Sequence, residues 1–526
     1  MQRSEKTMKT FIELFTDARA VSTPTVAIRT FDPTSTISTI QASLGAELGN
    51  LTPFITWDSI HGLRGLTDAG TTAAHSMASE VGMELGASVD LPIALGMLEH
   101  ATEDVLAFIM NPQLVWGEDT KVIQGIANLR NDYKARGNMC VLLIGIGDTI
   151  PVELQQDTLV LTHPLPTREE LAVVVRETYA YAFNSDSKKY KACKAGPTDD
   201  VILKCVDALI GIPLFPAEQA ASMCLDKVTG VMDIVTLWDR KKTIVSQQKG
   251  LTYRQGGLKL KDLYGVESFK NYGVKIMSGK FAPTVILRMD EIQRQFSGND
   301  TDSSGVKGDL LGEWLTWIND NKVFCTLSLG VPGSSKSHSI DCIAGEFDKP
   351  VIDYSISKMQ DSLVGNSNKH MVGANHTVDS ISDKRVWLIA TANKLDGLPP
   401  ELISRFQVGG VFFFDSPSPD EQKGILALKV VMHGLDPDQP YPDMTSWTGR
   451  DIENCALKAK MLGCSLIEAG EYVVPLMVSH REQMESLRHA ASDRFLSASQ
   501  SGVYKYTEPA VKHTPTVKIT EGRRMR

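Results

Sequence analysis

Leu329-Gly330-Val331-Pro332-Gly333-Ser334-Ser335-Lys336-Ser337 lies between a short apolar run, residues 323–329, and a helix-like segment. A glycine-bearing turn between a strand and a helix leaves backbone N–H groups free at the positive end of the helix dipole, where they can bind phosphate. Lys336 would then reach the β- and γ-phosphates, and the Ser337 hydroxyl would bind Mg²⁺. The stretch therefore predicts a phosphate-binding loop that consists of Gly330, Val331, Pro332, Gly333, Ser334, Ser335, Lys336 and Ser337.

One position departs from the usual phosphate loop. The residue before the lysine is Ser335 rather than glycine, which adds a side chain where phosphate approaches the backbone. This residue can weaken nucleotide affinity or slow turnover. The alternative interpretation of the stretch is an ordinary Gly/Pro/Ser turn whose lysine is solvated.

Length and composition limit the possible functions. At 526 residues the chain exceeds a single core, and roughly two to four domains are expected. The net charge of −9 argues against a nucleic-acid binder that works through overall charge. Eight scattered cysteines without a Cys-x-x-Cys pair predict reduced thiols. There is no apolar signal core and no apolar run of about 18 residues, so a cytoplasmic protein without a membrane span is expected.

The first 250 residues are predicted to form one α/β domain and one helical subdomain. Residues 1–166 alternate apolar runs with helix-like stretches, which favours a parallel sheet, and they contain no phosphate-loop pattern. Thr167, followed three residues later by Glu170, is a good helix start for a helical subdomain at 167–250. The expected strands are Thr25–Ile28, Phe54–Trp57, Leu106–Ile109, Cys140–Ile144 and Leu159–Leu161.

The second half repeats this organisation. Residues 251–415 predict another α/β core, which holds the phosphate loop, and residues 416–495 predict a helical region. Residues 496–526, where lysines and arginines are spread out among serines, are expected to form a poorly ordered tail. The strands of the second core are expected at 284–289, 323–329, 351–356, 386–390 and 411–414.

Two adjacent acids, Asp290 and Glu291, follow the apolar run 285–289. If that run is a parallel strand beside the phosphate loop, Asp290 can hold Mg²⁺ and Glu291 can polarise the attacking water. The alternative is an amphipathic strand that ends in solvated acids, and Arg288 within the run favours that alternative.

Two further polar residues occupy informative positions. Asn393 follows the apolar run 387–392, where it can hydrogen-bond a γ-phosphate or orient the water. Arg405 lies at the end of a short helix expected after Pro399. Such an arginine can reach a neighbouring subunit's nucleotide and stabilise the charge that develops on the transferred phosphoryl group.

These elements together resemble an AAA+ ATPase over about residues 251–495. The loop at 330–337, Asp290-Glu291, Asn393 and Arg405 are similar to the family's Walker A, Walker B, sensor 1 and arginine finger. Thr448-Gly449-Arg450 resembles sensor 2, with Arg450 at the position that touches the γ-phosphate. The resemblance implies two P-loop-NTPase-like α/β domains, each followed by a helical subdomain. It also implies ATP hydrolysis with Mg²⁺ and a homo-oligomeric ring, most often a hexamer, that acts on a protein substrate.

The resemblance also implies site residues and a closer set of relatives. The catalytic residues would be Glu291, Lys336, Asn393, Arg405 and Arg450, and the metal ligands would be Asp290 and Ser337. The chain is similar to uncharacterised AAA-domain proteins encoded in chloroplast and cyanobacterial genomes, whose N-terminal ATPase-like domain also lacks a phosphate loop. The shared stretches include Pro164–Glu170, Leu311–Trp317 and Ser362-Leu363-Val364-Gly365.

The order of the motifs departs from the family. Walker A precedes Walker B in AAA+ proteins, yet here Asp290-Glu291 come before Lys336. We interpret residues 284–320 as a strand-helix unit moved ahead of the phosphate loop. The family places the sensor 1 strand between the Walker A and Walker B strands, and short crossovers would let the moved unit keep its usual position.

Two rival functions stay open at the level of sequence. A nucleotide-gated scaffold with little turnover is favoured by Ser335 and Arg288, but Glu291 and Arg405 argue against it. A DNA-associated ATPase such as a helicase loader is not favoured, because no basic patch interleaved with aromatic residues is evident. Leu363 stands where many protein-threading relatives place an aromatic residue, which makes threading through a pore less secure.

Overall fold

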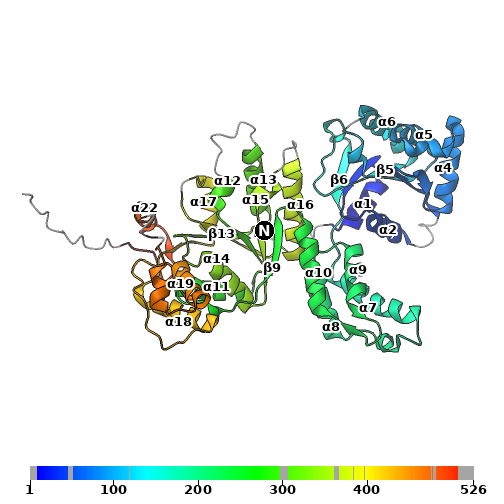
Figure 1. Ribbon diagram of the computed structural model, residues 1–526. Coiled ribbons are helices and arrows are strands. Elements are labelled where there is room, and N and C mark those ends of the chain that lie inside the picture. Colours follow the sequence, from blue (N-terminus) through cyan, green and yellow to red (C-terminus); the bar gives the residue numbers. More distant parts are fainter. Residues whose placement is uncertain are drawn as a thin grey trace, which may run out of the picture.

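The structure is a computed structural model that describes residues 9–45, 51–117, 119–296, 306–360, 366–382, 384–395, 397–475, 477 and 481–506. Two α/β units, each followed by helices, lie along the chain (Figure 1). The expected α/β class is confirmed.

The first unit is a six-stranded sheet with the order β3-β2-β4-β5-β1-β6. Neighbouring strands are parallel except for β3, which runs antiparallel to β2. The five strands expected from apolar runs are present. The sheet also contains β3 (Gly62–Gly65), a short strand that the sequence did not predict. The strands are β1 (Thr25–Arg29), β2 (Phe54–Asp58), β3 (Gly62–Gly65), β4 (Leu106–Met110), β5 (Met139–Ile144) and β6 (Thr158–Thr162).

Helices cover both faces of this sheet because its central strands are apolar on both sides. Phe54 and Phe108 pack with α1 and α2, whereas Trp57 and Ile109, which point the other way, pack with α4, α5 and α6. The helices are α1 (Phe11–Ala20), α2 (Pro33–Ser43), α4 (Asp68–Val81), α5 (Leu91–Leu98) and α6 (Thr120–Arg136), with short turns η1 (Leu85–Val89), η2 (Pro112–Leu114) and η3 (Val152–Leu154).

The turn after β1 carries an acid where a phosphate loop would bind its anion. The chain enters α2 directly, and the carboxylate of Asp32 caps the helix by accepting a 3.0 Å hydrogen bond from the Ser35 N–H. A carboxylate at the helix N-terminus occupies the place where a phosphate would bind and repels an anion.

A helical unit follows, as the sequence predicts from Thr167. The Thr167 hydroxyl accepts from the Glu170 N–H, and the Glu170 carboxylate accepts from the Thr167 N–H, which forms a capping box. The elements are α7 (Arg168–Ser185), η4 (Lys191–Ala195), α8 (Asp199–Leu209), α9 (Leu214–Cys224), α10 (Ile234–Gln247) and a small hairpin of β7 (Leu225–Asp226) and β8 (Val231–Met232).

The second sheet has seven strands in the order β15-β14-β11-β13-β10-β12-β9. β13 pairs in parallel with both β11, which carries the phosphate loop, and β10, which carries Asp290 and Glu291. The predicted position of the moved strand-helix unit is therefore confirmed. The strands are β9 (Leu251–Gln255), β10 (Val285–Met289), β11 (Phe324–Gly330), β12 (Pro350–Tyr354), β13 (Val386–Ala392), β14 (Val411–Phe414) and β15 (Leu496–Ser497).

Two expectations about this sheet are wrong. β10 is buried along its whole length, so the amphipathic-strand alternative fails, and Arg288 within it is paired with acids rather than solvated. Residues 496–506 do not form a disordered tail. Instead, β15 extends the edge of the sheet beside β14, and the Tyr504 hydroxyl donates a 2.6 Å hydrogen bond to Asp415. Residues 507–526 and the loop Ser362–Gly365 lie outside the described residues.

Helices pack on both faces of the second sheet. The helices between residues 419 and 491, which we call the lid, follow the sheet along the chain. The lid is coloured orange in Figure 1 and lies on the opposite side of this sheet from the first unit. The elements are η5 (Leu260–Asp262), α11 (Glu267–Met277), α12 (Ile292–Phe296), α13 (Val306–Asp320), α14 (Lys336–Glu346), α15 (Ile356–Met359), α16 (Asn366–Ser382), α17 (Pro400–Phe406), α18 (Pro419–His433), α19 (Gly449–Leu462), α20 (Leu466–Glu471) and α22 (Arg481–Ala491).

Helix α16 connects the two α/β units. Lys369 forms a 2.5 Å ion pair with Asp148, which follows β5 of the first sheet, and the backbone of Gly147 lies against the Lys369 carbonyl. From a different face of α16, Asn375 accepts a 2.6 Å hydrogen bond from the Tyr354 hydroxyl of β12. The helix is therefore held between the carboxyl edge of the first sheet and the core of the second.

The cysteines agree with the expectation of reduced thiols. All eight cysteines are free thiols, and seven of them are buried. Among the described residues, no helix combines the length and the apolar composition needed to span a membrane.

Candidate nucleotide-binding site

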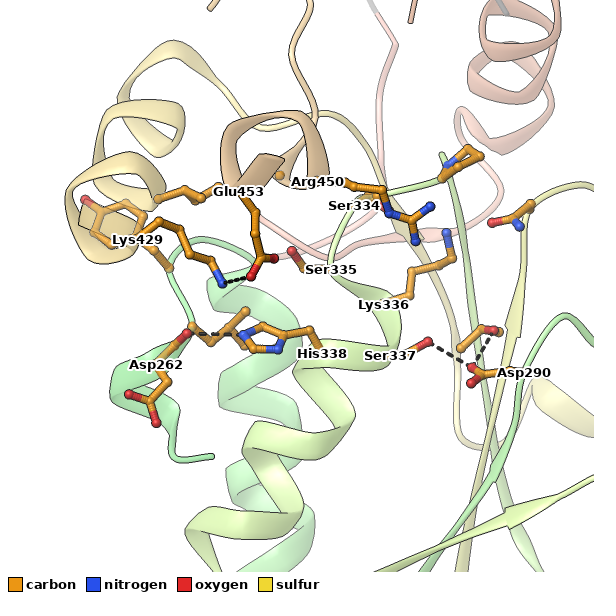
Figure 2. A pocket seen from close by; sticks show the side chains of 18 of the residues that line it. Asp262, Asp290, Ser334, Ser335, Lys336, Ser337, His338, Lys429, Arg450 and Glu453 are labelled. Carbon is orange, nitrogen blue, oxygen red and sulfur yellow. Dashed lines mark hydrogen bonds and ion pairs between the residues drawn. The ribbon is translucent and has the colours of Figure 1, made fainter. Parts of the chain in front are cut away.

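A cavity with a volume of about 620 Å³ lies at the carboxyl ends of the strands of the second sheet, under the lid. Figure 2 shows the phosphate loop and the start of α14 running across this cavity. Asp290 lies at one end, and Lys429, Glu453, Asp262 and His338 lie at the other. In open parallel sheets this edge is the usual place for a ligand.

The phosphate loop is held close to its neighbours by two glycines. A Cβ at Gly330 would lie 2.1 Å from the carbonyl oxygen of Phe414 on β14. Gly333 has a φ of 82°, and a Cβ there would lie 2.8 Å from both Thr448 and Arg450 of the lid. These positions require glycine because the backbone approaches another chain segment and, at Gly333, also has positive φ.

Ser335 adopts the left-handed conformation, with a φ of 64°, directly before α14. The usual glycine takes up this conformation without cost, whereas a residue with a Cβ is strained by about 1–2 kcal/mol. The serine therefore fits the loop at a conformational cost, and its side chain lines the cavity.

Lys336 is buried at the first position of α14, and its ammonium group donates hydrogen bonds to the carbonyls of Gly330 (2.9 Å) and Val331 (2.8 Å). Burial, helped by the nearby positive charge of Arg450, lowers the pKa of Lys336 to about 7, against the opposing effect of Asp290 and Glu291. A nearby anion favours the charged form of a lysine, so phosphate in this cavity would raise the pKa of Lys336 again.

Asp290 and Ser337 meet although 46 residues separate them in the chain. The Ser337 hydroxyl donates a 2.8 Å hydrogen bond to Oδ1 of Asp290, and the Thr391 hydroxyl donates a 3.1 Å bond to the same oxygen. The Asp290 side chain keeps 46% of its surface exposed, on the side of the cavity. A hydroxyl and a carboxylate in this arrangement are oxygen ligands of the kind that Mg²⁺ prefers.

Glu291 is held by groups on both of its carboxylate oxygens. The Asn393 amide donates to Oε1 at 3.0 Å, and Arg294, one turn further along, pairs with Oε2 at 2.7 Å. The Glu291 backbone has a φ of 49°, and its N–H donates to the Thr391 hydroxyl at 3.1 Å. A non-glycine residue in this conformation is strained, and strain of this kind clusters at functional sites.

The two expected arginines lie in different places. Arg450 lines the cavity from the first turn of α19, whose N-cap Thr448 forms a capping box with Asp451. Arg405 is exposed at the end of α17 and is not among the described residues that line the cavity. Within one chain, the structure therefore places the expected site residues around this cavity except three. Arg405 lies elsewhere, and Gly330 and Val331 do not line the cavity but accept hydrogen bonds from Lys336.

Sequence reasoning missed several cavity residues. Thr391 could have been found, since strand alternation places it on the same face as Asn393, two residues later. The pair of Lys429 with Glu453, at 3.0 Å, and His338, whose Nε2 lies 3.2 Å from the Asp262 carbonyl oxygen, had no such signal. Those residues meet only through the packing of the lid over the loop.

The residues present fit a nucleoside phosphate with a divalent cation. The cavity volume is in the range of small-molecule sites. One end offers two cations, Lys336 and Arg450, beside the oxygen donors of Asp290 and Ser337. The cavity extends from there past the loop to Lys429 and Glu453 of the lid, where a base and ribose would lie.

Comparisons with known proteins find similarity to AAA ATPases, and the family match lies in the first α/β unit. Residues 8–163 match the family described as "SpoVK-like AAA ATPase, N-terminal domain". The uncharacterized AAA domain-containing protein ycf46 of Guillardia theta is 22% identical over 396 residues, which cover 67% of this chain and 68% of that protein. The protein of the same description from Gracilaria tenuistipitata var. liui is 26% identical over 352 residues, which cover 62% and 66%.

Among solved structures, the AAA domain of FIGL-1 is 14% identical and covers 36% of this chain and 85% of that chain, with a TM-score of 0.25. The family match, the curated relatives and the strand order of the second sheet relate this chain to known proteins. On these observations the chain has a P-loop NTPase-like fold and resembles the AAA+ ATPases, the uncharacterised AAA domain-containing proteins among them.

Proposed function

We propose that this protein binds ATP with Mg²⁺ and hydrolyses it in the cavity between the second sheet and the lid. The observation that carries the proposal is the convergence of Lys336, Ser337, Asp290, Glu291 and Asn393 on one cavity from three neighbouring strands and their loops. A structural ion-pair cluster would not need a phosphate loop, a hydroxyl-carboxylate pair and a restrained acid in one place.

Each residue has a role that follows from its position. Lys336 and Arg450 bind the phosphates, while Asp290 and Ser337 hold Mg²⁺. Bound Mg²⁺ offsets negative charge on the phosphate oxygens. Glu291 orients and deprotonates the attacking water, and Asn393 keeps the Glu291 carboxylate in place through its 3.0 Å hydrogen bond.

We further propose that the protein works as a homo-oligomeric ring, most simply a hexamer, that remodels a protein partner. The exposed position of Arg405, outside its own cavity, supports an action on the nucleotide of a neighbouring subunit. The net charge of −9 favours a protein partner over a nucleic acid. A cytoplasmic location stays a prediction from the sequence.

A nucleotide-gated scaffold is the second candidate, and one observation favours it. Arg294 and Asn393 engage both oxygens of Glu291, so each oxygen has only one lone pair left for the attacking water. A protein that remained in this state would bind nucleotide and turn it over slowly.

Steady-state ATP hydrolysis across a protein concentration series separates the two candidates. Turnover that rises with concentration and is lost in Glu291→Gln supports an assembled ATPase. Glu485→Gln is the matched control, because this exposed lid carboxylate pairs with Arg481 and does not line the cavity. If wild type binds ATP but hydrolyses it no faster than Glu291→Gln, the scaffold is the better account. Binding of DNA that weakens with salt would instead support the DNA-associated ATPase.

A further inference from the structure

Arg288 is a buried cation on β10, two residues before Asp290, and its side chain is only 5% exposed. Residues two apart on a strand point to the same face, so Arg288 and Asp290 share the face covered by α14. Burying a guanidinium in an apolar sheet is costly unless several groups compensate it. Its neighbours on the strand, Leu287 and Met289, are fully buried apolar residues.

Three acids surround this guanidinium. Asp353, its register partner on β12, accepts from Nε at 2.7 Å, and Asp341 on α14 accepts from Nη1 at 2.9 and 3.0 Å. The third is Asp290, whose Oδ2 lies 3.4 Å from Nε. Burial alone would lower the pKa of Arg288, but the three carboxylates raise it, so the cation is permanent.

The same contacts connect both residues that would hold Mg²⁺. Arg288 touches Asp290 through Oδ2, which leaves Oδ1 directed at Ser337 and Thr391. Asp341 follows Ser337 by four residues on α14, so the two side chains lie on one face of that helix. One planar guanidinium thereby fixes the strand that carries Asp290 against the helix that carries Ser337.

We propose that Arg288 is a positioning residue that orients the Asp290 carboxylate and locks β10, α14 and β12 together around the Mg²⁺ site. This inference rests on the proposed function, in which Asp290 and Ser337 hold the metal. Lysine cannot replace arginine here, because an ammonium group cannot donate to three carboxylates in the directions in which the planar guanidinium donates.

Positioning and simple electrostatics predict different results for Arg288→Lys. If Arg288 only placed positive charge near the metal, this substitution would leave metal binding unchanged. If it positions Asp290, Arg288→Lys keeps the charge but weakens metal binding, by about 10-fold or more, as found for residues that orient metal ligands.

The experiment measures Mn²⁺ binding by electron paramagnetic resonance in the full chain saturated with ADP, for wild type and Arg288→Lys. Binding of ADP in the presence of EDTA should stay within about twofold of wild type, since the metal-free contacts to phosphate do not involve Arg288. The matched control is Arg254→Gln, which removes a 2.5 Å ion pair to the same Asp353 from β9 without touching Asp290.

A double variant guards against misfolding. Arg288→Met combined with Asp341→Asn removes one positive and one negative charge, so the net charge near the metal is unchanged, and Asp353 keeps its ion pair with Arg254. Its circular dichroism and melting curve report whether it folds. It too should bind Mn²⁺ weakly. Unchanged or tighter Mn²⁺ binding in Arg288→Lys would overturn the role of Arg288. Absence of ADP-dependent Mn²⁺ binding in wild type would overturn the proposed function, and this role with it.

Discussion

The Ser337 hydroxyl donates a 2.8 Å hydrogen bond to the Asp290 carboxylate, although in this chain the acid precedes the phosphate loop. β13 lies between the two strands that carry them and pairs with both. The relation between loop and acid therefore depends on strand order in the sheet and not on order in the sequence. A strand-helix unit can change its place in the chain as long as its new connections are short.

Thr391 should be needed for turnover, because its hydroxyl links the two acids. It donates to Asp290 at 3.1 Å and accepts from the Glu291 N–H at 3.1 Å. Thr391→Val keeps the shape but leaves that N–H without its partner, at a cost of about 1–3 kcal/mol. We expect the kcat of ATP hydrolysis to fall about 10- to 100-fold, with ADP affinity in EDTA unchanged. Unchanged kcat in a folded variant would contradict this prediction.

Nucleotide affinity should depend on pH through Lys336, whose pKa is lowered to about 7 by burial and by Arg450. Phosphate binding raises that pKa, so above pH 7 a proton must be taken up when the ligand binds. The affinity for ADP should be flat below about pH 7 and should fall up to about tenfold per pH unit above it. Isothermal titration calorimetry at several pH values measures this slope. Lys336→Met should bind weakly and lack the slope; the same slope in both proteins would rule out Lys336 as its source.

Replacing Ser335 with glycine should strengthen nucleotide binding. Ser335 has a φ of 64° and lines the cavity, so Ser335→Gly relieves strain and clears space beside the phosphates. The gain of about 1 kcal/mol in the folded state is partly offset by glycine's freedom in the unfolded state, so stability should change by less than about 1 kcal/mol. Fluorescence titration with a labelled nucleotide measures affinity, and urea unfolding measures stability.

Ser335→Ala is the control for that experiment. It removes the hydroxyl but keeps a Cβ in the left-handed conformation. If alanine tightens binding as much as glycine does, the hydroxyl and not the backbone conformation limits affinity.

The sequence predicts those strands whose formation depends mainly on the burial of apolar side chains. β10 and β11 are mostly apolar because helices cover both faces of the sheet, so they could be recognised directly despite Arg288 in β10. β9, with Thr252, Arg254 and Gln255 at the sheet edge, and β15, only two residues long, depend on pairing with β12 and β14. No local sequence pattern identifies such edge strands, because they form only by pairing with a neighbouring strand.

The candidate site likewise contains residues that the sequence predicts and a residue whose role it does not predict. Lys336, Ser337, Asp290, Glu291 and Asn393 were predicted from loop and strand-end positions, and the structure places them in one cavity. The role of Arg288 was missed, because a charged residue in an apolar run suggests exposure unless its three carboxylate partners are known. Two of those partners, Asp341 on α14 and Asp353 on β12, come from other elements, and only the tertiary structure brings them to Arg288.

The contact between the first unit and α16 should be sensitive to Gly147. A Cβ at this position would lie 2.4 Å from the carbonyl oxygen of Lys369, a backbone atom that cannot turn away. Gly147→Ala should therefore loosen α16 from the first sheet, and hydrogen exchange of the α16 amides should become faster. The control is Gly86→Ala, since no atom lies within 4 Å of a Cβ at Gly86. Equal exchange of the α16 amides in the two variants would contradict the contact.

Arg405 should act on the nucleotide of a neighbouring subunit. It is exposed on α17 and does not line its own cavity, whereas Glu291 lies within the cavity of its own chain. Arg405→Ala and Glu291→Gln should each abolish hydrolysis alone, because one lacks the cation and the other lacks the acid. Mixed rings restore complete sites where a chain with intact Glu291 meets a chain with intact Arg405. With equal amounts and random assembly, about a quarter of the sites are complete, so activity should return on mixing and peak near an equal ratio. If Arg405 acted within its own chain, every site in the mixture would lack one group, and no ratio would restore hydrolysis.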